Sequence, residues 1–132
     1  MVAVVSVQSI PPALARTRPR PAVFDRDYSS ALATADRFLH AWQTRDAESG
    51  ILLLTDRARQ RTEEDRVHDF FSGERSGSFE IGRGKKRAGG KYEFPVALFA
   101  RDAARARESR PKTVLLIVVK AGHDDWAVDQ LP

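Results

Sequence analysis

Apolar residues recur every three or four positions between Tyr28 and Trp42, which predicts an amphipathic helix with one buried stripe. Asp27 or Ser29 is expected to cap the free amides at the start of this helix through a side-chain oxygen. A single helix cannot bury such a stripe, so we expect it to pack on a surface formed by the rest of the chain. The stripe consists of Tyr28, Leu32, Ala35, Phe38, Leu39 and Trp42.

Two further helices are predicted before residue 73. Asp46 is a candidate cap for the second, in which apolar residues follow at helical spacing from Ala47 to Ala58. The acidic run at 62–65 resembles a capping box and predicts a short third helix through Phe71.

The period changes from helical to alternating after Ser78, which predicts strands over 78–82 and 92–98 with a turn at 88–90. Pro95 has no amide to donate, so it indicates an edge strand or a bulge. The continuous β-branched run 112–119 predicts a central strand covered on both faces, and residues 126–130 predict a last strand.

This order of elements predicts the α+β class. We expect N-terminal helices, with a long first helix, packed on the concave face of a curved antiparallel sheet of about four strands. Residues 27–132 are interpreted as a single domain, which suits a chain of 132 residues.

Residues 1–26 are interpreted as an N-terminal tail that ends in a linker rich in proline and arginine. Its first 15 residues are apolar and end in Ala13-Leu14-Ala15, which resembles the cleavage site of a secretory signal. Two interpretations stay open: a disordered tail of a cytoplasmic protein, or the remnant of a signal peptide on an extracytoplasmic one. The sequence contains no apolar run of about 18 residues, so no transmembrane helix is predicted.

Several segments resemble, in their order along the chain and in the character of the first helix, the elements of the nuclear transport factor 2-like superfamily, a cone-shaped α+β domain. They are residues 35–42, 45–46, 52–56, 70–73 and 126–128. The resemblance covers roughly Tyr28 to Leu131 and implies the curved sheet expected above. Members include ketosteroid isomerases, polyketide cyclases and dehydratases, and many non-catalytic ligand-binding, dimerising or accessory domains. It also implies a homodimer through the outer face of the sheet.

The enzymatic members of this superfamily place titrating side chains inside the cone, and this sequence supplies few candidates. Asp36 and His40 form an i,i+4 pair and are the nearest, but both lie off the apolar stripe. Glu80 and Glu93 alternate with large apolar residues, so we expect both to point away from the buried face. No catalytic residue is therefore assigned.

The sequence favours a non-catalytic ligand-binding or protein-association domain. The alternative is a small-molecule isomerase, cyclase or dehydratase with a pocket inside the cone. In either case an apolar small molecule would contact the aromatic residues that carry a polar group. These are Tyr28, Trp42, Tyr92 and Trp126.

Charge adds a second alternative, the binding of anions or nucleic acid by a basic hairpin. Residues 73–132 hold 12 Lys or Arg and 8 Asp or Glu, whereas residues 1–72 hold 10 of each, so the sheet half carries the net charge of +4. Basic residues without exposed aromatic neighbours do not favour nucleic acid. The basic residues of this hairpin are Arg83, Lys85, Lys86, Arg87 and Lys91.

Neither a metal site nor a cofactor is predicted. The chain contains no cysteine, which excludes thiolate ligands. His123 stands beside Asp124 and Asp125 in an expected turn, and these three local ligands are too few for a protein metal site.

Overall fold

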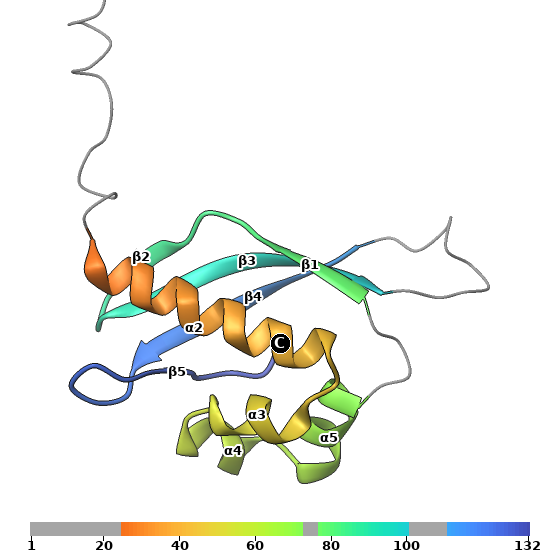
Figure 1. Cartoon of the computed structure of the whole chain (residues 1–132). Helices are drawn as coiled ribbons and strands as arrows, with labels where there is room; N and C mark the ends of the chain where they lie inside the picture. The colour runs from red at the N-terminus through yellow and green to blue at the C-terminus, as the bar shows by residue number, and fades with distance from the viewer. Residues whose placement is uncertain (1–24, 73–76, 101–110) are drawn as a thin grey trace, which may run out of the picture.

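The computed structural model describes residues 25–72, 77–100 and 111–132. Four helices precede five strands along the chain, and the helices lie on one side of a curled antiparallel sheet (Figure 1). The α+β class and the long first helix on a concave sheet are thus confirmed. Among the described residues, no helix has the length and apolar character needed to cross a membrane.

The long helix α2 (Arg26–Gln43) buries the predicted stripe against the sheet. Ala35, Phe38 and Leu39 are fully buried, whereas Tyr28 and Trp42 near its two ends are half-buried. The predicted caps are wrong, because Asp27 and Ser29 lie inside the helix. The cap is Asp25, whose Oδ1 accepts the amides of Asp27 at 3.0 Å and Tyr28 at 3.1 Å.

The predicted second helix is divided into two, α3 (Ala47–Leu52) and α4 (Asp56–Arg61). Asp46 caps α3 as expected, by accepting the amide of Ser49. The helix is interrupted because residues 53–55 pair with the last strand instead. The amide of Val128 donates to the Leu53 carbonyl at 2.7 Å, and the amide of Thr55 donates to the Val128 carbonyl at 2.9 Å.

The third predicted helix is α5 (Glu64–Ser72), which packs with α3 against the C-terminal half of α2. Its aromatic residues complete the core at this end. The ring of Phe71 lies 5.2 Å from that of Phe38 and 4.9 Å from that of Phe70. The hydrophobic contacts of α5 therefore hold the short helices to the long one.

The sheet is antiparallel, with the strand order β1-β3-β4-β5 and β2 paired to β3 beside β1. The strands are β1 (Gly77–Ile81), β2 (Lys85–Arg87), β3 (Lys91–Ala100), β4 (Lys112–Lys120) and β5 (Trp126–Val128). Helix α2 contacts β1, β3, β4 and β5, so it lies across the concave face (Figure 1).

A bulge separates β1 from β2. Ile81 pairs with Val96 and Lys85 pairs with Glu93, so the three residues 82–84 oppose the two residues 94–95. Such an extra residue increases the local twist and bends the strand. Pro95 is part of this site, which confirms the expectation that it marks a bulge, although β3 itself is an inner strand.

The bulge requires glycine at position 84. A Cβ atom there would lie 2.4 Å from the Phe94 ring, closer than real side-chain contacts allow. The amide of Gly84, which does not pair with β3, donates to the hydroxyl of Tyr28 at 2.9 Å. Helix α2 thus satisfies a polar group that the bulge releases from the sheet.

We expect Gly84→Ala to lower the free energy of unfolding by about 1–3 kcal/mol, because the new methyl group overlaps the buried Phe94 ring. Gly122→Ala is the matched control, since its Cβ meets only the flexible Asp125 side chain, at 3.3 Å. Urea denaturation of both variants measures the difference. Equal stability of the two variants would contradict the close packing of the bulge.

Candidate functional site

The concave side of the sheet is filled by side chains from α2 and the central strands. Phe38, Phe94 and Leu116 are fully buried and belong to one continuous core. Among the described residues, Thr34 is the one buried residue of polar or charged type, at 1% exposure. A catalytic acid or base inside the cone would need a buried titrating group there, and the described core offers only the phenol of Tyr92.

Three of the four predicted ligand-binding residues meet at one end of the sheet. The rings of Tyr28 and Tyr92 lie 5.9 Å apart, and those of Tyr92 and Trp126 lie 5.7 Å apart. Phe94 joins them at 5.6 Å from Tyr28. We call Tyr28, Tyr92, Phe94 and Trp126 the aromatic end cluster. These spacings are those of directly packed rings, so the cluster closes this end of the core.

Trp42 does not belong to the aromatic end cluster. It stands 14 residues after Tyr28 on α2, about 21 Å along the helix, and packs near Phe70 at 6.4 Å. The four residues therefore do not line one pocket. Residues that recur every three or four positions lie on one face of a helix, but residues at opposite ends of a long helix remain far apart.

Both tyrosine hydroxyls of the aromatic end cluster are engaged within the protein. Tyr92 donates to Oδ2 of Asp25 at 3.2 Å, and the Tyr28 hydroxyl accepts the amide of Gly84. The Tyr28 amide, followed by the Tyr92 hydroxyl and the Asp27 amide, holds the pKa of the Asp25 carboxyl below its usual value, against the opposing effect of burial. Burial, with a smaller effect of Asp25, raises the pKa of Tyr92 to about 12.

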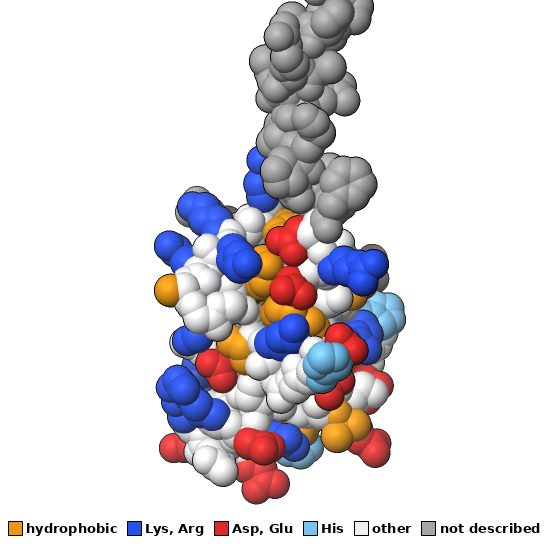
Figure 2. Space-filling view, turned by 90° about the vertical axis from the view of Figure 1, so that its left-hand side faces the viewer, with side chains coloured by type: hydrophobic (Ala, Val, Ile, Leu, Met, Phe, Trp, Pro, Cys, Tyr) orange, Lys and Arg blue, Asp and Glu red, His pale blue; other side chains and the backbone are white. Residues whose placement is uncertain are grey.

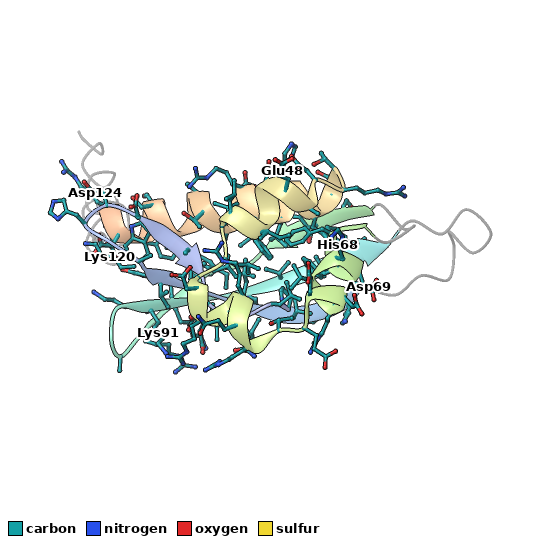
Figure 3. All side chains as sticks on the ribbon, turned by 90° about the horizontal axis from the view of Figure 1, so that it is seen from below. Glu48, His68, Asp69, Lys91, Lys120 and Asp124 are labelled. Atoms are coloured by element: carbon teal, nitrogen blue, oxygen red, sulfur yellow. The ribbon has the colours of Figure 1, made fainter. Side chains whose placement is uncertain are left out.

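At this end of the molecule apolar side chains are visible between acidic and basic ones (Figure 2). Lys120 lies over the Trp126 ring, with its Nζ 5.8 Å from the ring centroid. Lys120 and Asp124 on the β4–β5 hairpin and Lys91 on β3 lie at the same end of the sheet (Figure 3). The aromatic end cluster is therefore tightly packed and surrounded by charged side chains.

Two neighbouring grooves lie outside the core, beside α2. The larger, of about 770 Å³, runs between α2, the α3–α4 turn and the β4–β5 hairpin, and Trp126 lines it. The smaller, of about 560 Å³, lies between α2 and α3 and is lined by Asp36 and His40. Both of these side chains are exposed, so the pair has no dry environment in which to act as acid and base.

The other titrating candidates also face solvent. His68 and Asp69 on α5 project from the surface (Figure 3), and His123 is exposed in its turn. Over residues 25–72, 77–100 and 111–132 no group of three acidic or histidine side chains is arranged to hold a metal ion.

The five basic hairpin residues are all exposed, and the structure divides them between the two faces of the sheet. Lys86 opposes the inward-facing Tyr92, and its charge contributes to lowering the pKa of Asp25. Lys85 opposes Glu93, and Arg87 opposes Lys91, on the outer face. Arg87 forms an ion pair with Glu93, with Nε 2.7 Å from Oε1.

The outer face of the sheet, where the resemblance implies a homodimer contact, carries a group of apolar residues that the sequence analysis did not single out. We call Pro95, Ala97, Phe99, Leu115 and Ile117 the outer sheet patch. Register places them on one face, because Pro95 opposes Leu115, Ala97 opposes Thr113 and Glu93 opposes Ile117. The prediction that 112–119 is covered on both faces is wrong within one chain, because no described helix lies on this face (Figure 1) and Leu115 is 56% exposed.

Comparisons with protein-family models, with curated proteins and with solved structures found no match to this chain.

Tyr92 offers a direct test of the aromatic end cluster. The variant Tyr28→Phe leaves Tyr92 as the only tyrosine, and we expect its tyrosinate absorbance in the folded protein to appear with a midpoint near pH 12. In urea the midpoint should be about 10. Because the folded state favours the protonated phenol, its contribution to stability is complete below about pH 10 and is lost as the pH rises through about 12.

Circular dichroism on the same samples shows where the fold persists, so that ionisation is assessed only there. A midpoint near 10 in folded protein would mean that the Tyr92 hydroxyl is solvated and that this end of the core is open.

Proposed function

We propose that this chain is a non-catalytic protein-association domain and that the outer sheet patch is its association surface. The observation that carries this proposal is the contrast between the two faces of the sheet. Phe94 and Leu116, which oppose each other on the inner face, are fully buried, whereas Leu115, the direct partner of Pro95 in the pairing, is 56% exposed. The order of elements also supports kinship with the nuclear transport factor 2-like superfamily, in which such non-catalytic domains occur.

The outer sheet patch has the properties of an interface. Its members lie side by side on β3 and β4, which pair with each other over residues 92–98 and 112–118. Leu115 is exposed and Pro95, Ala97, Phe99 and Ile117 are partly exposed, and contiguous apolar surface of this kind marks sites of interaction. Burying Leu115 alone contributes about 1.5–3 kcal/mol, and this sheet position cannot turn inward without moving Leu116 outward.

The packed interior argues against the alternative of an isomerase, cyclase or dehydratase. Such an enzyme needs room for the substrate beside a titrating group of perturbed pKa. In the described core, aromatic and aliphatic side chains fill the concave face, and Asp36 and His40 lie outside it.

The two most exposed large apolar residues of the described chain give a matched test, because Leu115 belongs to the outer sheet patch and Leu52 lies on the helical side at 72% exposure. A photo-crosslinking amino acid is placed at one or the other position in the native host. We expect a discrete protein adduct at position 115 and none at position 52, because only position 115 lies in the outer sheet patch.

Circular dichroism confirms that both variants fold before they are compared. Equal adduct yields at 115 and 52, or adducts at 52 alone, would show that the outer sheet patch is not where this protein associates.

A further inference from the structure

The outer sheet patch has a strongly basic border on the same face. Lys85 opposes Glu93, which opposes Ile117 on the next strand, and Arg87 opposes Lys91. Directly opposed residues in antiparallel strands point to the same side. Lys85, Arg87 and Lys91 therefore continue the surface that begins at Ile117.

Two of these three cations have no carboxylate partner among residues 25–72, 77–100 and 111–132. The ion pairs in the described part of the chain are Arg59 with Asp56 and Arg87 with Glu93. Lys85 and Lys91 take part in neither. Covering the outer sheet patch would remove water from these ammonium groups, which is costly unless the covering surface supplies anions.

We propose that the outer sheet patch binds an acidic amphipathic helix of another protein, with the helix's apolar stripe on Leu115 and Ile117 and its carboxylates against Lys85 and Lys91. This inference rests on the proposed association function and names the kind of partner. The geometry suits a helix, because two adjacent strands span about 10 Å, close to the diameter of a helix with its side chains. The opposite face of these strands already holds α2 in this manner.

Charge argues against a second copy of this chain as the occupant. The net charge of +4 comes entirely from residues 73–132, the half that forms the sheet. On the outer face the exposed carboxylate is Glu80, opposite Ala97, while Glu93 is occupied by Arg87. Two such faces would bring more cations than free carboxylates together, and like charges across an interface cost several kcal/mol.

A polyanion without apolar groups also fits this surface poorly. A phosphate backbone would leave the exposed Leu115 unburied. A helix with both apolar and acidic side chains matches both parts of the surface.

The test uses short fluorescein-labelled peptides and the full chain. The first peptide has leucine at three- and four-residue spacing between glutamates, the second replaces its leucines by serine, and the third replaces its glutamates by lysine. Anisotropy titrations at low salt are expected to show binding of the first peptide, at least about tenfold tighter than either other peptide. Binding should weaken as salt is raised.

Variants locate the bound peptide on the structure. We expect Leu115→Lys, and separately the pair Lys85→Glu and Lys91→Glu, each to weaken binding of the first peptide about tenfold or more. Leu52→Lys is the matched apolar control, and the exposed α4 pair Arg57→Glu and Arg61→Glu is the matched charge control. Both controls should bind as the unmodified chain does.

The inference is overturned if the serine peptide binds as tightly as the leucine peptide, or if the α4 charge control weakens binding equally. It is also overturned if sedimentation shows a dimer that Leu115→Lys dissociates, since the occupant is then a second copy. Binding to anionic phospholipid vesicles that depends on Leu115 and exceeds peptide binding would assign the surface to a membrane instead. In these last two cases the outer sheet patch remains an interaction surface, whereas insensitivity of every readout to Leu115→Lys would refute the proposed function as well.

Discussion

Burial of the α2 stripe in a curled sheet is the constraint on which the rest of this structure depends. The sheet can enclose α2 only if its edge bends, and the bulge at 82–84 provides a local cause for that bend. The bulge brings the backbone of Gly84 against Phe94 and turns its amide toward Tyr28. The same helix is capped by Asp25, which also accepts the Tyr92 hydroxyl. The start of α2 therefore forms hydrogen bonds to the bulge at Gly84 and to Tyr92 on β3.

These ties determine which side of the sheet is free for function. The rings of Tyr28, Tyr92 and Trp126 pack against one another, and both tyrosine hydroxyls form hydrogen bonds within the protein. In a related arrangement with an open interior, the same residue types would be suited to line a pocket. Here they stabilise the closed end of the core, and on the described part of the sheet the exposed large apolar residue is Leu115, on the outer face.

The sequence pattern was sufficient where local and tertiary preferences agree. The spacing of apolar residues predicted α2, α5 and β3, because one face of each of these elements is buried in the same core. It failed at residues 53–55, where pairing with Val128 outweighs a continuous helix. The predicted caps, Asp27 or Ser29, lie two and four residues after the observed cap, Asp25, because several acidic and hydroxyl side chains near the helix start have similar capping preference.

The candidate site was the least predictable part, and the reason is physical. Residues 114–119 are apolar at consecutive positions, which predicts burial on both faces of the strand but does not say whether the second face is covered within the chain or by another molecule. In the structure Leu116 and Val118 are buried on the face that holds α2, while Leu115 and Ile117 lie on the opposite face, which no described helix covers. Within the part of the chain that the structure describes, the helices cover only one of the two apolar faces of β4. The same described residues offer Lys85 and Lys91 no carboxylate partner, so the incompletely satisfied groups of this domain lie on its outer face and not in its core.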